Sequence, residues 1–171
     1  TIRSFVEDNS FGLLLSFDGS GIQDTHTPFI FSEDGKSLLG HIARANPQWK
    51  SWAENRKVKV IFTGPHAYIS PSYYVTEFAV PTWNYSAVSI SGDLTIVDEE
   101  KYVLEFLDKL VAKFEKPKNP WRMNRADERY MKLLSGIVVF SISMESVDAS
   151  FKMNQNKSEE DRSKVIDSLS A

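Results

Sequence analysis

The residues best suited to chemistry in this sequence include an arginine placed just before a helix start. Arg44 precedes Asn46-Pro47, an asparagine and a proline in the order typical of a helix N-cap and its first helical residue. A guanidinium supplies a planar fork of donors and a helix start adds a favourable dipole, so together they could hold a phosphate. An arginine taken alone is usually a solvated surface residue, and only the neighbouring Asn46-Pro47 favours an anion site.

A second set of side chains could bind a flat ligand. Trp83 and Asn84 are adjacent, and an aromatic face beside an amide suits a ring that is apolar on its faces and polar along one edge. Gln155 and Asn156 offer further amides, and Lys152 adds a cation. Large aromatic residues are also common in cores and interfaces, so the sequence supports a ligand-binding role and a packing role for Trp83 equally.

The three histidines, His26, His41 and His66, raise the question of a metal centre. They fall on separate predicted strands, without the short spacing of known metal motifs, so we predict no metal site. We expect His66 to be a hydrogen-bonded barrel or interface residue, and His41, close to Arg44, to lie nearer a ligand. The sequence has no G-x-S-x-G elbow, no P-loop and no G-x-G-x-x-G, and it predicts no catalytic residue.

Composition and charge limit the class of protein. The 171 residues are 42% hydrophobic and 25% charged, which is typical of one folded domain over residues 1–171. The absence of cysteine excludes disulfides and thiolate metal sites, and we expect a cytoplasmic protein. No apolar run approaches the roughly 20 residues of a membrane helix, so no membrane contact is predicted. A net charge of −3 disfavours general nucleic-acid binding.

One segment, from Lys109 to Lys132, is locally basic. Its eight basic residues are Lys109, Lys113, Lys116, Lys118, Arg122, Arg125, Arg129 and Lys132. The segment is either a solvated helical pair, which we favour, or the footprint of DNA or another acidic partner.

Apolar and alternating runs between turn signals predict a mainly β fold. The predicted strands cover residues 12–17, 22–31, 37–43, 57–63 with a continuation over 66–69 after a bend, 88–96 and 136–153. Their number and short connections predict a closed antiparallel barrel with flanking helices.

Four helices are predicted around these strands. A short helix follows Asn46, a second covers about 124–134, and a capping box of Ser158 and Asp161 begins a C-terminal helix. A longer helix begins near Asp98, and its predicted buried face contains Val103, Leu107, Leu110, Val111 and Phe114.

Five motifs in this order resemble those of the PaiB-like family of FMN-binding split barrels. They are Thr25-His26-Thr27-Pro28-Phe29, Gly40-His41-Ile42-Ala43-Arg44-Ala45-Asn46-Pro47-Gln48-Trp49, Gly64-Pro65-His66-Ala67-Tyr68-Ile69-Ser70, Val80-Pro81-Thr82-Trp83-Asn84-Tyr85 and Lys152-Met153-Asn154-Gln155-Asn156-Lys157. Family members commonly have leucine in place of Thr27 and serine in place of Asn154. The resemblance implies an antiparallel Greek-key split barrel that forms a homodimer, with FMN at the subunit interface.

The resemblance also implies roles for individual residues. Arg44 and Asn46, at the end of the third strand, would hold the FMN phosphate with help from Lys152, while Trp83 or Tyr85 would contact the flavin face. The implied cofactor-binding set is His26, Thr27, His41, Arg44, Asn46, Trp83, Asn84, Lys152, Gln155 and Asn156.

Two functions follow from the resemblance, and the sequence leaves both open. One is an FMN-binding negative transcriptional regulator, acting on DNA directly or through a partner. The other is a flavin-dependent oxidoreductase or flavin reductase of the split-barrel type. Haem or another planar ligand in the same groove is a third interpretation, because a fold of this kind does not settle function.

Overall fold

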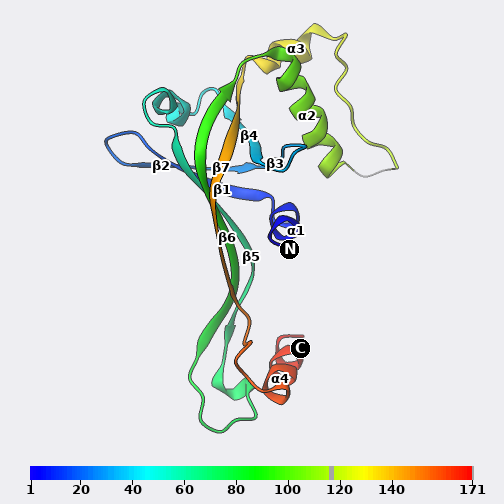
Figure 1. Cartoon of the computed structure of the whole chain (residues 1–171). Helices are drawn as coiled ribbons and strands as arrows, with labels where there is room; N and C mark the ends of the chain where they lie inside the picture. Colours follow the sequence, from blue (N-terminus) through cyan, green and yellow to red (C-terminus); the bar gives the residue numbers. More distant parts are fainter. Residues whose placement is uncertain (116–117, 171) are drawn as a thin grey trace.

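The computed structural model describes residues 1–115 and 118–170, and one antiparallel sheet forms its centre (Figure 1). The strands are β1 (Phe11–Phe17), β2 (Ile22–Pro28), β3 (Ile30–Phe31), β4 (Ser37–Ala43), β5 (Lys57–Ile69), β6 (Thr82–Val97) and β7 (Ile137–Lys152). They are hydrogen-bonded in the order β2-β1-β5-β6-β7-β4-β3.

The two edge strands of this order are neighbours in the chain, which closes the sheet into a barrel. Only Phe29 separates β2 from β3, and at this seam the hydroxyl of Thr27 donates to the main-chain oxygen of His41 on β4 at 2.5 Å. The predicted antiparallel barrel is therefore confirmed. The prediction of one strand over residues 22–31 is wrong, because the chain changes its partner strand at the buried Phe29.

Aromatic side chains from several strands fill the barrel. The ring of Phe29 lies 5.5 Å from that of Phe62 on β5 and 6.1 Å from that of Phe140 on β7. Trp52, on the 3-10 helix η1 (Pro47–Ala53), packs its ring 5.1 Å from Phe140 and covers one end of the core. The short helix predicted after Asn46 is thus present, with Asn46 as its N-cap and Pro47 in its first turn.

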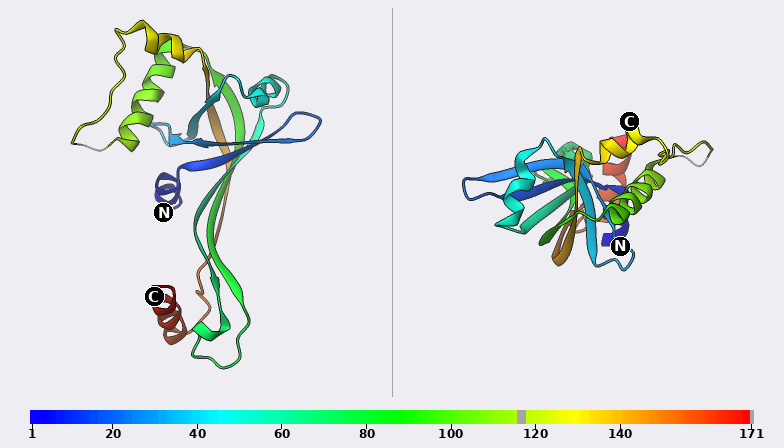
Figure 2. Two further views of the ribbon diagram at one scale, coloured as in Figure 1. Left: turned by 180° about the vertical axis from the view of Figure 1, so that it is seen from behind. Right: turned by 90° about the horizontal axis from the view of Figure 1, so that it is seen from above.

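Strands β5, β6 and β7 extend well beyond the barrel and form an arm, which Figure 1 and the left view of Figure 2 show from opposite sides. At its far end lie the 3-10 helix η2 (Pro71–Tyr73), the loop to β6 and α4 (Glu159–Ser170). The strand predicted at 88–96 begins earlier, at Thr82, because residues 82–85 pair with β5 at the arm end.

The arm leaves the barrel at a bend that the sequence predicted. The β5–β6 register shifts between Thr63 and His66. Gly64 lies inside this bend, where a Cβ would come within 2.5 Å of the ring of Phe5 from α1 (Ile2–Asp8). A glycine is required there because the first helix packs directly against the strand.

The longer helix, α2 (Glu100–Phe114), covers the barrel near β3 and β7 through Phe106 and Leu110. The predicted buried face is partly wrong: Phe106 and Leu104 are buried, whereas Phe114 is 55% exposed at the last residue of the helix. The helix predicted over 124–134 is shorter, α3 (Glu128–Leu134), because Asp127 caps its first turn. Lys116, part of the basic segment, lies outside the described residues.

The C-terminal helix is tied to the arm end through Asp161. Its amide donates to the Ser158 hydroxyl at 3.1 Å, as the capping box predicts. Its carboxylate instead accepts from the amides of Val75 and Thr76 at 2.8 and 3.0 Å and from the Thr76 hydroxyl at 2.7 Å. These donors, led by the Thr76 hydroxyl, lower the pKa of Asp161.

Across residues 1–115 and 118–170, none of the helices combines the length and apolar character that a membrane crossing requires.

Candidate cofactor-binding site

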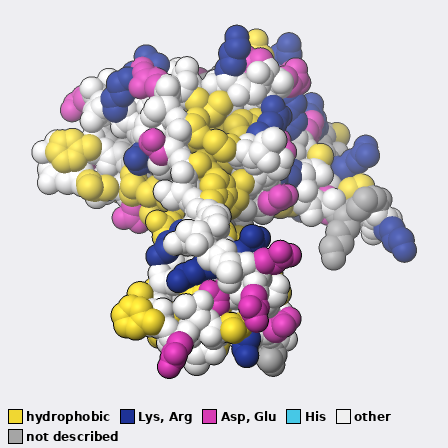
Figure 3. Space-filling view, turned by 60° about the horizontal axis from the view of Figure 1, so that its bottom comes forward, with side chains coloured by type: hydrophobic (Ala, Val, Ile, Leu, Met, Phe, Trp, Pro, Cys, Tyr) yellow, Lys and Arg dark blue, Asp and Glu magenta, His cyan; other side chains and the backbone are white. Residues whose placement is uncertain are grey.

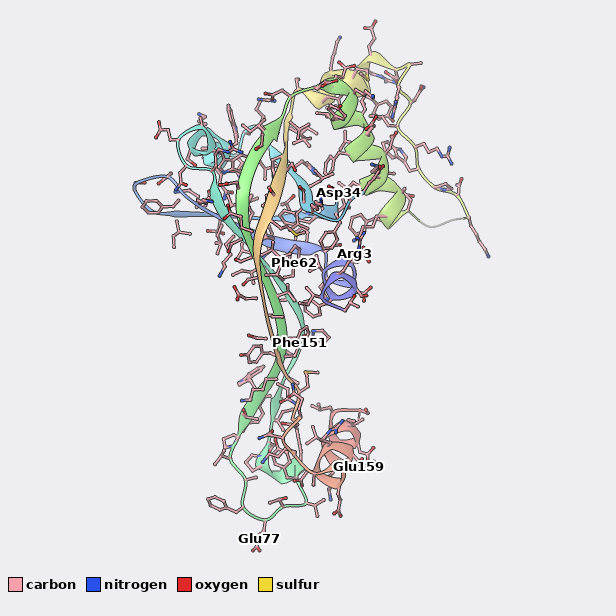
Figure 4. The ribbon with its side chains drawn as sticks, viewed as in Figure 1. Arg3, Asp34, Phe62, Glu77, Phe151 and Glu159 are labelled. Carbon is pink, nitrogen blue, oxygen red and sulfur yellow. The ribbon has the colours of Figure 1, made fainter. Side chains whose placement is uncertain are left out.

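The ten residues predicted to bind a cofactor fall into two groups in different parts of the molecule. The arm group comprises Trp83, Asn84, Lys152, Gln155 and Asn156, and the barrel group comprises His26, Thr27, His41, Arg44 and Asn46. Figure 4 marks the two regions, with Phe62 inside the barrel, Phe151 on the arm, and Glu77 and Glu159 at the arm end. Within one chain, the two groups are not brought together.

One side of the arm is a layer of exposed rings, which we call the aromatic plate: His66, Tyr68, Trp83 and Tyr85. His66 pairs directly with Tyr85, and Tyr68 with Trp83, so all four side chains project from the same face of β5 and β6. The ring of Trp83 lies 6.1 Å from Tyr68 and 6.2 Å from His66. Trp83 is 54% exposed, so it is available to a ligand or a second protein chain.

The opposite side of the arm holds two buried amides without complete partners. Asn84 is 8% exposed and Asn154 is 5% exposed. Among the described residues, the Oδ1 of Asn84 accepts no hydrogen bond and the Nδ2 of Asn154 donates none, whereas the Oδ1 of Asn154 accepts from the Tyr74 hydroxyl at 3.2 Å. Buried polar atoms are nearly always paired, so an unused acceptor and donor on one arm indicate a polar site.

Asn154 was not among the predicted residues, although its motif was. It adopts a left-handed backbone, with φ of 59°, which asparagine tolerates better than serine does. Asparagine at a position where the family commonly has serine was the available signal. The turn it forms also involves Gln155, whose side chain accepts from the amide of Met153 at 2.7 Å and donates to the main-chain oxygen of Phe151.

The two other arm residues lie at the surface. The amine of Lys152 donates to the hydroxyl of Thr82 on the neighbouring strand, and Lys152 pairs with Tyr85 in the sheet. Asn156 is exposed in the turn before α4. Gln155 stabilises the turn through its own side chain, whereas Lys152 and Asn156 keep donors that can reach a ligand.

In the barrel group, Arg44 connects β4 to the start of β7. Its Nε donates to the main-chain oxygen of Ser135 at 2.7 Å, and its Nη2 donates to that of Ile137 at 2.9 Å. The guanidinium also lies 5.6 Å from the ring of Trp49. Because a guanidinium has five N–H donors, an exposed Arg44 fixed in this way still has donors for an anion.

Asn46 belongs to a separate polar network. Its Oδ1 accepts from the amide of Gln48 at 3.0 Å, and its Nδ2 donates to the hydroxyl of Thr25 at 2.7 Å. The buried Gln48 accepts from Thr25 at 2.5 Å and donates to the hydroxyl of Ser16 at 3.0 Å. Arg44 and Asn46 therefore contact different neighbours, and Asn46 has a structural role whether or not it also binds a ligand.

The remaining barrel residues lie near the seam. Thr27 is buried and bonds the main chain of His41, whose ring packs 5.7 Å from that of Phe106 beneath α2. Burial lowers the pKa of His41, and its Nδ1 has no partner among the described residues. His26 is exposed, with its ring stacked 5.7 Å from Phe11. Across these residues no group of three or more His, Cys, Asp or Glu is arranged to bind a metal.

The aromatic plate continues onto the outside of the barrel, and we call this whole surface the outer face. One row across it pairs His26 with Leu13, Leu13 with Ile61, Ile61 with Ser89, and Ser89 with Asp148. On the barrel part of the outer face, the large apolar side chain of Phe11 is 65% exposed. Figure 3, which brings the arm end forward, shows hydrophobic side chains gathered on the barrel beside the arm.

Comparison with known proteins gives three concordant results. The model of a family described as "Putative FMN-binding domain" matches residues 1–146. The chain is 37% identical over 172 residues to the protease synthase and sporulation protein PAI 2 of Bacillus subtilis, covering 98% of this chain and 82% of that protein.

Solved structures extend the comparison to the fold. The flavocytochrome Anf3 from Azotobacter vinelandii matches with a TM-score of 0.67 at 14% identity, covering 95% of this chain and 71% of that one. A putative pyridoxamine 5'-phosphate oxidase from Listeria innocua matches with a TM-score of 0.54 at 16% identity, covering 86% of this chain and 94% of that one. The predicted split-barrel fold is confirmed by these matches.

Proposed function

Because the chain belongs to the family described as "Putative FMN-binding domain", we propose that it is an FMN-binding regulatory protein that works as a homodimer. The observation that carries this proposal is the separation of the candidate residues into an arm group and a barrel group. A single chain keeps the two groups apart, whereas two chains can bring the arm of one against the barrel of the other.

The outer face supports the dimer. It exposes Phe11, Trp83 and Tyr85 on one continuous side of the sheet, and large exposed apolar areas usually mark an interaction surface. Small residues, Ala87 and Ser89, lie on β6 between the plate and the barrel part of this face. Small side chains allow two sheets to approach closely, while aromatic residues on either side supply the buried area.

The residues fit FMN as the ligand of such a site. The aromatic plate offers flat apolar area for the ring system. The unpaired Oδ1 of Asn84 and Nδ2 of Asn154 lie on the opposite side of the arm, so they are separate from a ring stacked on the plate. The phosphate requires cationic donors, which Arg44 retains and Lys152 can supplement. FMN, when bound, supplies electron-transfer chemistry, and the protein binds and orients it.

Dimerisation and cofactor binding can be tested together at Ser89. Replacing Ser89 with arginine places a charge at the middle of the outer face, so we expect a monomer in light scattering and weak FMN binding in a flavin titration. Ser163→Arg adds the same charge to the exposed side of α4 and is the matched control. A dimeric Ser89→Arg protein with full FMN affinity would refute the interface.

A regulatory role requires a partner, and the basic segment is the candidate for DNA. Three of its cations are already paired: Lys109 with Glu33 at 2.7 Å, Arg129 with Asp127 at 2.6 Å, and Arg125 with Asp108. Lys113, Lys118, Arg122 and Lys132 form no ion pair among the described residues. Burial lowers the pKa of Lys113.

The direct DNA contact is tested by salt dependence. Four phosphate contacts per subunit predict a slope of about −4 in log affinity against log salt, and about −7 for a dimer. We expect such a slope with DNA from the promoter neighbourhood of the gene, and a smaller one for Arg122→Ala. A dimer that binds this DNA neither with nor without FMN would refute direct regulation.

A flavin-dependent oxidoreductase is the second candidate, favoured by the similarity in fold to a flavocytochrome. The absorption spectrum of the purified protein identifies the bound group, since flavin and haem absorb differently. Anaerobic addition of a reduced nicotinamide is the direct test, and bleaching of the flavin band is the expected result for an enzyme. A flavin band that stays unchanged with both reduced nicotinamides would count against this role.

A further inference from the structure

His66 is the one imidazole in the aromatic plate, and the sequence predicted it to be a hydrogen-bonded barrel or interface residue. It lies directly opposite Tyr85 on β6, and its ring is 6.2 Å from that of Trp83 at an interplanar angle of 34°. The imidazole is thus tilted relative to the indole and lies in the same exposed layer. A flat ligand stacked on Trp83 would therefore have His66 at its border.

The orientation of this imidazole is set by the bend in β5. The Nδ1 of His66 lies 3.3 Å from the main-chain oxygen of Gly64. A carbonyl oxygen can only accept, so Nδ1 carries the proton of this hydrogen bond and Nε2 is the nitrogen left for a ligand. Gly64 is held in turn by the ring of Phe5, which leaves no room for a side chain at that position.

The row of the arm that contains His66 includes a lysine and no acidic residue. Lys152 of β7 pairs with Tyr85, which pairs with His66, so the three residues form one row across the arm. The other groups that face His66 are the rings of Tyr68 and Trp83. Asp148 is the nearest carboxylate along the outer face of β7, and it pairs with Ser89, four residues from Tyr85 on β6. A ligand on the plate therefore meets the imidazole of His66, and the row contains no carboxylate, while the amine of Lys152 donates to the Thr82 hydroxyl.

We propose that His66 contacts bound FMN through Nε2 and stabilises the reduced cofactor relative to the oxidised one, an inference that rests on the FMN site proposed above. Reduced flavin carries a negative charge near neutral pH, and positive or hydrogen-bonding groups beside the ring favour that form. His66 supplies such a group on the plate, beside Tyr85 and Trp83. His66 is thus assigned a role in tuning the cofactor, beyond binding it.

The test is the reduction potential of bound FMN, measured by anaerobic dithionite titration with a reference dye, together with FMN affinity. In His66→Gln, we expect the preference for reduced over oxidised FMN to fall about tenfold, which equals about 30 mV for a two-electron couple. His66→Phe keeps a ring in the plate but has no nitrogen, and the same loss is expected. Lys164→Gln removes an exposed cation from α4 and should leave the potential unchanged.

Variants that bind FMN with the wild-type potential would overturn the role of His66 and leave the proposed function intact. A loss confined to His66→Gln, with His66→Phe retaining the wild-type potential, would also overturn it. A wild-type protein that binds no FMN would overturn the inference and the proposed function together.

Discussion

Replacing Arg44 with alanine separates phosphate binding from barrel stability, because the structure gives this residue both tasks. Its two hydrogen bonds to the main-chain oxygens of Ser135 and Ile137 are at the protein surface, and their loss should cost about 1–2 kcal/mol of unfolding free energy. Loss of a hydrogen bond to the charged FMN phosphate should also cost about 1.5–3 kcal/mol of binding free energy, the usual magnitude for hydrogen bonds to charged groups. This corresponds to a rise in Kd of about 10- to 150-fold.

The assay compares FMN with riboflavin, which lacks the phosphate, in fluorescence titrations of the same variant. We expect Arg44→Ala to weaken FMN binding and to leave riboflavin binding unchanged. Arg56→Ala is the matched control, because Arg56 also donates to the barrel, to the main-chain oxygen of Leu94 at 3.0 Å and to the hydroxyl of Thr95 at 2.6 Å. Equal weakening of both flavins by Arg44→Ala, or an equal effect of Arg56→Ala on FMN, would refute the phosphate role.

Three further predictions concern the scaffold. Gln48→Ala removes the partner of the buried Ser16 hydroxyl and the acceptor of the Thr25 hydroxyl, and it should destabilise the fold by about 2–4 kcal/mol in urea unfolding. Gly64→Ala places a Cβ 2.5 Å from the ring of Phe5 and should cost about 1–3 kcal/mol, whereas Gly21→Ala, with open space around it, should cost little. Burial lowers the pKa of His41, so the unfolded chain binds more protons than the folded one as the pH falls. The free energy of unfolding should therefore be highest above about pH 6.5 and decrease below it. His41→Met should reduce this decrease, as measured by urea unfolding at several pH values.

Each of these three stability predictions can be contradicted by one result. A Gln48→Ala protein as stable as the wild type would show that water replaces the amide. Equal effects of alanine at Gly64 and Gly21 would show that α1 moves away from the arm without cost. A pH slope that His41→Met leaves unchanged would assign the acid sensitivity to other groups.

The sequence predicted best those features that short segments determine. The strand at 37–43 has the predicted bounds, and Asn46 caps the helix after it, because alternation and capping depend on residues a few positions apart. The bend at Gly64-Pro65 was also predicted, since glycine and proline mark such points locally. The predicted strand 22–31 failed at Phe29, where the pattern stays apolar although the partner strand changes.

The site could be predicted only in part, because its geometry depends on contacts between distant segments. Nothing near Arg44 in the sequence shows that its guanidinium bonds residues 135 and 137. Gln48 is similar: its amide contacts Ser16 and Thr25, and a glutamine is ordinarily an exposed residue. The unpaired atoms of Asn84 and Asn154 are visible only once both side chains are placed in the arm.

The distribution of the motifs has one further consequence. Residues for the flavin ring lie on the arm, while the residues for its phosphate lie on the barrel, and the chain closes its barrel without bringing them together. Under the proposed dimer, the order of motifs along the sequence therefore describes two half-sites, each completed by the other subunit. A heterodimer of Arg44→Ala and Trp83→Ala chains provides the test: one of its two sites would carry both substitutions and the other neither. Such a mixed dimer should bind one FMN with wild-type affinity, whereas sites contained within single chains would leave both impaired.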